Sequence, residues 1–311
     1  MIRKLVIAGM PGSGKSTYIA ALRHLLVTHE VPTKLTATRL SDAEKHLNKL
    51  EEDWIACKKV ERTKQAVEEW VSLFVKREAD SAEAEIVVPD FSGEAFRRPA
   101  ATGNCSAAIA NMLSEIDGLL LFTNADRGAD DVRLESLEGI LVDDSPAPDD
   151  SAESNDKAAA GEAGTSDKTA ASRAAPDGSV PFDPLNMPEE PLLVELLQIL
   201  NRSPRVPTER MIAVIVSAWD AVEDPELSPE QWLNQHRPML WQYLHGNRDL
   251  WSVRVYGVSA QGGRLPEEKV ALQGKIPGQR VQVVGHEAQP HDLTAPIDWL
   301  MTSAVGAHDQ A

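Results

Sequence analysis

The residues whose types and spacing point most directly to chemistry are 9–17, which read GMPGSGKST. They follow a short apolar run at 5–8 and precede a segment in which leucine and isoleucine recur with helical spacing. A complete GxxxxGK(S/T) pattern between a strand and a helix is typical of a loop that binds nucleotide phosphates. The glycines let backbone N–H groups turn toward phosphate oxygens, and the helix start adds a positive dipole end.

Two side chains of this loop have separate expected tasks. Lys15 would reach the β- and γ-phosphates, and the Ser16 hydroxyl would coordinate Mg²⁺. We expect the phosphate contacts to come from the loop as a whole, that is, from Gly9, Pro11, Gly12, Ser13, Gly14, Lys15, Ser16 and Thr17.

Apolar runs alternate with amphipathic segments along the rest of the chain. We expect strands at about 4–8, 71–75, 86–88, 118–123, 211–217 and 251–258, and helices at about 17–27, from 41 onward, and at 103–116, 190–201, 229–246 and 295–303. Strands that are nearly all apolar indicate a sheet covered on both faces. The polar turn at 78–83 predicts an antiparallel hairpin. The expected fold class is therefore α/β, a P-loop NTPase with a mostly parallel central sheet, helices on both faces and an antiparallel hairpin edge.

Three of the expected strands end in short polar motifs. The motifs are DFSGE at 90–94, SAWD at 217–220 and SAQ at 259–261. Parallel α/β sheets bind ligands at the carboxyl ends of their strands. The sequence therefore predicts that these motifs and the phosphate loop gather around one ligand.

Composition narrows the class of protein. The chain has 311 residues, 42% of them apolar, and its net charge of −17 disfavours a nucleic-acid-binding surface. Cys57 and Cys105 lack metal-ligand spacing and indicate a reducing, cytoplasmic compartment. Since no segment approaches the roughly 20 apolar residues that cross a bilayer, we expect no membrane partner.

One stretch, 143–184, differs in composition from the rest. It holds ten acidic against three basic side chains and almost no large apolar residue. Such a segment cannot bury enough apolar surface to offset its chain entropy, so we interpret it as an acidic disordered insertion. The remainder, 1–142 and 185–305, is the size of one P-loop domain, and 306–311 is expected to be a flexible tail.

The four motifs in this order resemble the set that marks the GTPase superclass: GxxxxGK(S/T), DxxG, a degenerate (N/T)KxD and SA(K/L/Q). The segments GMPGSGKSTYIAALRHLL, DFSGE, VSAWD and VYGVSAQGG also look like the bacterial double-GTPase family. In that family two paired GTPases are encoded together in predicted conflict or antiphage systems. The resemblance implies GTP as substrate, Mg²⁺ as cofactor, hydrolysis to GDP as a molecular switch, and a second GTPase or an effector as protein partner.

The resemblance also assigns roles around the γ-phosphate. Asp90 would hold Mg²⁺ opposite Ser16, and the Gly93 N–H would sense the γ-phosphate. Glu94 stands where many GTPases have a water-orienting glutamine, and either it orients water at a like-charge cost or it is a solvated surface acid. Thr63 is the candidate that completes the Mg²⁺ shell, with Thr33, Thr36 and Thr38 as rivals. Lys15, Glu94 and Thr63 are thus the expected catalytic residues.

Base recognition is expected from the last two motifs. Asp220 would accept hydrogen bonds from guanine N1 and N2, which adenine cannot donate in that geometry. Ser259 and Ala260 would approach the guanine O6 through backbone N–H groups. The chain departs from small GTPases at Ser217 and at Ala218, which stand in place of Asn or Thr and of a lysine. Trp219 either restores part of the stacking or is a core aromatic.

Two alternative functions stay open. A P-loop kinase of a small molecule or nucleotide would use the same phosphate loop, although the chain shows no arginine-rich lid segment. A nucleotide-gated assembly protein with little turnover would share the GTP site and differ in rate. Arg62, beside Thr63, is either an arginine finger in cis or an ordinary surface arginine.

Overall fold

A computed structural model describes residues 2–39, 44–58, 70–88, 94–127, 183–202 and 210–302. The sheet and the candidate site lie in one compact unit, formed by Met1–Asp130 and Met187–Ala311. The predicted insertion at 143–184 falls outside the described residues except at its last two positions, and the predicted tail at 306–311 falls outside them entirely. The domain boundaries therefore stay a prediction.

An eight-stranded sheet runs through the described part of this unit, in the order β2-β3-β4-β1-β5-β6-β7-β8. Parallel pairing joins β4, β1, β5, β6 and β7. Antiparallel pairing adds β2 and β3 at one edge and β8 at the other. The strands are β1 (Arg3–Gly9), β2 (Leu35–Arg39), β3 (Val71–Arg77), β4 (Glu83–Val88), β5 (Gly118–Asn124), β6 (Arg210–Ser217), β7 (Trp251–Ser259) and β8 (Gln282–Val284). The α/β class, the mostly parallel sheet and the antiparallel hairpin are thus confirmed.

The central strands divide their side chains between two apolar layers. In β1, Leu5 and Ile7 face one layer while Val6 and Ala8 face the other, and β5 and β6 alternate in the same way. Successive side chains of a strand point to opposite faces, so a strand that is apolar throughout must be covered on both. The continuous apolar runs in the sequence follow from this arrangement.

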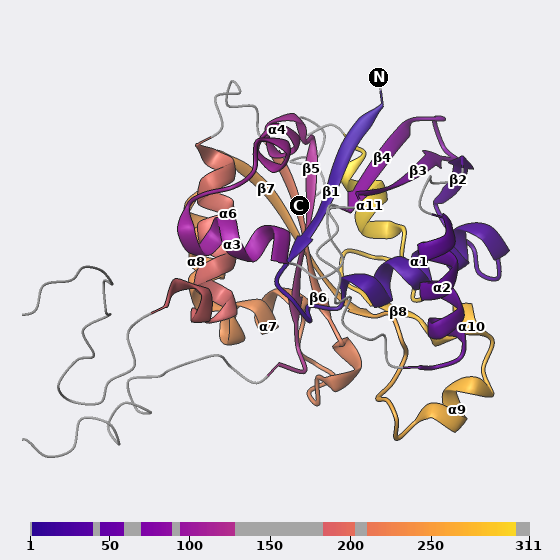
Figure 1. Cartoon of the computed structure of the whole chain (residues 1–311). Helices are drawn as coiled ribbons and strands as arrows, with labels where there is room; N and C mark the ends of the chain where they lie inside the picture. The colour runs from indigo at the N-terminus through magenta and orange to yellow at the C-terminus, as the bar shows by residue number, and fades with distance from the viewer. Residues whose placement is uncertain are drawn as a thin grey trace, which may run out of the picture. The chain divides into compact units, whose positions relative to one another are not determined.

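Helices cover the two faces (Figure 1). The first layer includes α1 (Lys15–Thr28), α2 (Glu44–Ile55) and α11 (Ala295–Leu300), with α9 (Lys269–Gln273) and α10 (Pro277–Arg280) on the same side. The second layer is formed by α3 (Glu94–Thr102), α4 (Ala107–Glu115), α6 (Glu189–Asn201), α7 (Pro229–His236) and α8 (Pro238–Gly246). Two single 3₁₀ turns, η1 (Pro184–Asn186) and η2 (Trp219–Ala221), complete the described elements.

One predicted helix is divided in two, and another begins later than predicted. The helix expected at 229–246 divides at Arg237, whose φ of −137° leaves the helical region immediately before Pro238. A residue before proline is pushed away from helical geometry, which ends α7 and starts α8. The helix expected at 103–116 begins later, at α4, because Gly103 adopts a φ of 70° and Ser106 caps the new helix. The preceding helix, α3, was not predicted.

Candidate nucleotide-binding site

The loop between β1 and α1 has the backbone geometry that its glycines predict. Gly12 and Gly14 have φ values of 78° and 88°, in the left-handed region that favours glycine. The Ser13 N–H donates to Met10 O at 3.2 Å, which tightens the turn. The loop then enters α1 directly at Lys15, so it lies at the positive end of a 14-residue helix.

The Lys15 side chain is buried inside this loop. Its Nζ donates to Gly9 O at 2.9 Å, to Met10 O at 3.0 Å and to the Ser13 hydroxyl at 3.2 Å. Burying an ammonium group is costly unless hydrogen bonds satisfy it. The loop thus fixes the positively charged Lys15 ammonium beside backbone N–H groups at the start of a helix. This combination of groups suits the phosphates of a nucleotide.

Two neighbouring strands hold the loop in place. The hydroxyl of Ser217, at the end of β6, donates to Ser13 O at 2.9 Å, and Asn124 Nδ2, at the end of β5, donates to Gly12 O at 3.0 Å. Ser217 therefore keeps a structural task although it departs from the small-GTPase pattern. Asn124 was missed, although its place directly after an apolar strand is the same signal that marked the other motifs.

Gly14 is a position at which any side chain should disturb the loop. A Cβ there would lie 2.7 Å from both Cβ and Oγ of Ser217, and the φ of 88° adds backbone strain. We expect Gly14→Ala to destabilise the fold by about 1–3 kcal/mol and to weaken nucleotide binding, because the loop must shift. Thermal unfolding and nucleotide titration measure the two effects. Gly246→Ala is the matched control, since a Cβ at Gly246 meets nothing within 4 Å; equal effects of both substitutions would contradict the prediction.

The residues predicted to read the base come together at the ends of β6 and β7. Ser259 is buried, and its hydroxyl donates a short hydrogen bond to the exposed Asp220 carboxylate while accepting from the Gly262 N–H at 3.1 Å. Ala218, with φ 54° and ψ 42°, turns the chain so that η2 places Asp220 beside Ser259. A carboxylate fixed by a neighbouring hydroxyl is suited to accept paired N–H donors from a base.

The loop after β7 also contacts α2. Trp54 Nε1 donates to Ala260 O at 2.9 Å. The Arg280 guanidinium lies 4.6 Å from the Trp54 ring centroid, and its Nη1 contacts Cys57 Sγ at 2.6 Å. Helix α2 is therefore attached to the predicted base-reading loop, a contact that the sequence does not reveal.

Trp219 packs against the sheet. A Cβ on Gly257 of β7 would lie only 2.3 Å from the Trp219 ring, and the ring adjoins the second apolar layer. Of the two roles that the sequence left open for Trp219, packing is the one that the structure shows. Residue 257 must be glycine because a side chain there would overlap the Trp219 ring.

The family model "Double-GTPase 1" matches residues 6–300, which is nearly the whole chain. The chain belongs to the Double-GTPase 1 family. The resemblance to double-GTPases predicted from the motifs is confirmed, and membership together with the phosphate loop supports a GTP-binding protein.

Three solved structures are similar to this double-GTPase family member, each at low identity. Bacterial selenocysteine-specific elongation factor EF-Sec is 12% identical over 88% of this chain and 28% of its own (TM-score 0.36). The GTP-bound Ski7 GTPase-like domain of S. cerevisiae is 11% identical over 97% and 51% (TM-score 0.43). The cytosolic domain of the T. maritima FeoB iron transporter in apo form is 12% identical over 89% and 66% (TM-score 0.29). The chain thus spans between about a quarter and two thirds of these structures, and such distant likenesses carry no argument about function. No curated protein matches the chain.

Several predicted site residues lie outside the described residues. These are Thr63, Asp90 and Gly93, together with Arg62. Glu94 is placed only as the first residue of α3. Within the described ranges, no group of three or more His, Cys, Asp or Glu side chains is arranged to hold a metal ion. The partly buried Ser16, at the start of α1, is the described residue whose hydroxyl fits Mg²⁺ in the general phosphate-loop pattern.

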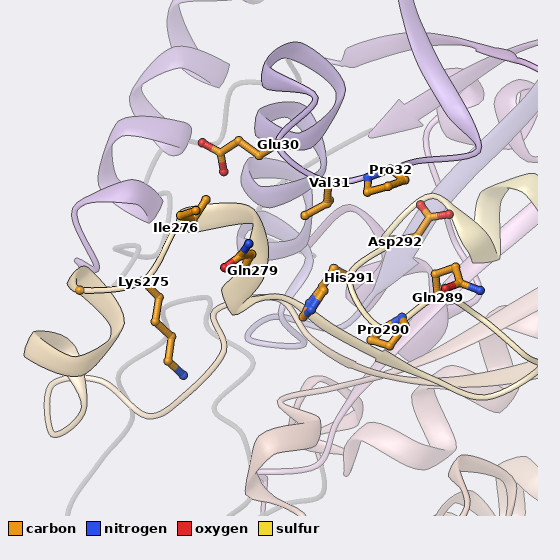
Figure 2. A pocket seen from close by; sticks show the side chains of 11 residues that line it. Glu30, Val31, Pro32, Lys275, Ile276, Gln279, Gln289, Pro290, His291 and Asp292 are labelled. Carbon is orange, nitrogen blue, oxygen red and sulfur yellow. The ribbon is translucent and has the colours of Figure 1, made fainter.

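A surface pocket of about 750 Å³ lies elsewhere, past the far end of α1 (Figure 2). Its lining includes Val31, Gln279 and His291, and no residue of the phosphate loop or the base-reading motifs. A 14-residue helix is about 21 Å long, so α1 separates this pocket from Lys15. Helices in the described part of the chain are all too short or too polar to span a membrane.

Proposed function

We propose that this protein binds GTP with Mg²⁺ and hydrolyses it to GDP and phosphate as a molecular switch. The observation that carries the proposal is the Lys15 ammonium, which is held inside a glycine loop. This loop and the Asp220–Ser259 pair lie at the same end of the sheet, where the parallel strands have their carboxyl ends. At this end of the sheet, Lys15 offers a positive charge for phosphates and Asp220 offers a hydrogen-bond acceptor for a base. Membership of the Double-GTPase 1 family supports the same ligand.

The residues of the chain divide the work of binding and reaction. Lys15 and the N–H groups of the loop would stabilise the charge that develops on the transferring phosphoryl group. Asp220 would accept from guanine and leave its carboxylate unpaired against adenine, which disfavours ATP. Ser16, with Asp90 and Thr63, would hold Mg²⁺, which supplies charge neutralisation at the phosphates. Glu94 would stand beside the attacking water.

The switch and its partner are further parts of the proposal. The γ-phosphate would order the segments that contain Thr63 and Gly93, and its loss would release them. A second GTPase or an effector would bind the ordered form, in keeping with the family's name. We place this pair in a bacterial conflict or antiphage system.

The test is nucleotide selectivity and turnover of the wild-type protein. We expect fluorescent GTP and GDP analogues to bind with Mg²⁺ at least about 100-fold more tightly than ATP, because the Asp220 carboxylate would pair only with guanine. Phosphate release from GTP is then followed in a single turnover. Preference for ATP would favour the kinase alternative, whereas tight GTP binding without phosphate release would favour the nucleotide-gated assembly protein.

A further inference from the structure

Arg127 lies against the phosphate loop, and no motif assigns it a task. It follows the end of β5 by three residues, and its guanidinium lies beside Gly12. A Cβ built on Gly12 would be 3.5 Å from Nη2, 3.8 Å from Cζ and 4.0 Å from Nε of this side chain. Gly12 is exposed, and the Arg127 side chain is 34% exposed, so the guanidinium is both beside the loop and accessible.

A buried carboxylate holds this arginine. Arg127 Nη1 lies 3.5 Å from Oε2 of Glu189, the first residue of α6, whose side chain is 1% exposed. Arg237 Nη2 approaches the same oxygen at 3.9 Å, and Arg237 itself bonds to Asn124 O and the Thr123 hydroxyl at the end of β5. Glu189 thus lies between one buried and one accessible arginine, which restricts Arg127 to the rim of the loop.

The strand order shows which part of a nucleotide Arg127 can reach. β5 pairs with β1 on one side of the phosphate loop, and β4, which leads to the predicted γ-phosphate motif at 90–94, pairs with β1 on the other. Next beyond β5 is β6, which ends in the base-reading motif. Arg127 therefore approaches from the base side of the loop, where the shared diphosphate and ribose of GDP and GTP would lie.

Charge at this place supports the same role. The base-reading motif at 217–220 has Ala218 where the small-GTPase pattern has a lysine, so this motif supplies no positive side chain. A guanidinium offers a rigid fork of donors that matches phosphate oxygens. We propose that Arg127 is a nucleotide-binding residue that contacts the phosphate–ribose portion common to GDP and GTP.

This inference rests on the proposed function, and Arg127→Ala tests it. Titration with fluorescent GDP and GTP analogues should show both affinities falling by a similar factor of about 10 to 100, the effect of losing a charge-assisted hydrogen bond. Arg127→Lys, which keeps the charge and loses the fork, should fall between wild type and alanine. The rate of phosphate release at saturating GTP should change less than about threefold, because a contact shared by both nucleotides is not specific to the transition state. Arg248 is an exposed arginine three residues before β7 begins, at the end of this strand opposite to the base-reading motif. Arg248→Ala therefore controls for the change in net charge and should bind as wild type does.

Three other results would overturn the inference. Unchanged affinities in Arg127→Ala, with the wild type binding both nucleotides, would overturn it alone. An unchanged affinity with phosphate release slowed by about 10³ would assign Arg127 to the transition state as an arginine finger instead. A wild-type protein that binds neither guanine nucleotide would overturn the proposed function and this inference together. Thermal unfolding of each variant confirms that the fold is kept.

Discussion

Lys15→Ala should lower the affinity for GTP by at least about 100-fold, because it removes the one charged side chain of residues 9–17, beside which the phosphates are proposed to lie. Phosphate release should fall below detection, since the same ammonium would stabilise the transferring phosphoryl group. Titration with a fluorescent GTP analogue and a phosphate-release assay measure the two effects. The Gly9 and Met10 carbonyls lose a donor as well, so a modest fall in thermal stability is also expected.

The control for Lys15 is a lysine of equal charge at a distance. Lys275 is exposed and lines the separate pocket past α1, so Lys275→Ala changes the net charge equally and should leave GTP binding intact. If Lys15→Ala unfolds near the wild-type temperature and still binds and hydrolyses GTP normally, the phosphate site has been placed in the wrong loop. Lys15→Arg separates charge from shape, and we expect it to be nearly as defective, because a guanidinium does not fit the buried position.

The second large effect is expected at Asp220. Asp220→Ala should weaken GTP binding by about 100-fold or more without weakening ATP binding, because only guanine would donate two hydrogen bonds to that carboxylate. The preference between the two nucleotides should therefore disappear. Competition between unlabelled GTP and ATP for a fluorescent analogue gives both affinities in one experiment.

Glu223→Ala is the matched control for Asp220, since Glu223 is an exposed acid three residues further along the same loop. Ser259→Ala should cost less than Asp220→Ala, because it removes the hydroxyl that orients the carboxylate and leaves the acceptor itself. A GTP preference that survives in Asp220→Ala would show that another group reads the base. The phosphate loop would then remain a nucleotide site without this guanine contact.

Sequence patterns predicted most of the parts that position the site. The loop at 9–17 could be predicted because its glycines are required by the local backbone conformation of the loop. The strands β1, β5 and β6 could be predicted because an uninterrupted apolar run is typical of a strand that is covered on both faces. The order of motifs at strand ends then predicted the family. Short elements gave weaker signals: β8 has three residues and α10 four, which is too few for a period to be recognised.

The rest depends on contacts between distant parts of the chain. Trp54 and Ala260 are 206 residues apart, and nothing in either segment indicates that they bond. Arg127 and Glu189 are separated by 62 residues, so their joint position at the loop is visible only once β5 and α6 are placed. The start of α4 had a local signal, because the Ser106 side chain accepts from the Ile109 N–H as an N-cap, and the helix predicted from 103 overlooked it.

The hydrogen bond from Trp54 to Ala260 has a thermodynamic consequence for any partner of this protein. This bond joins α2 to the loop after β7. Each of the two segments is therefore more stable in its observed position when the other segment is in its observed position as well. A molecule that binds α2 in this position would therefore raise the affinity for whatever the loop holds. Reciprocity then requires the loop's ligand to strengthen that molecule's binding by the same factor, even though the two never touch.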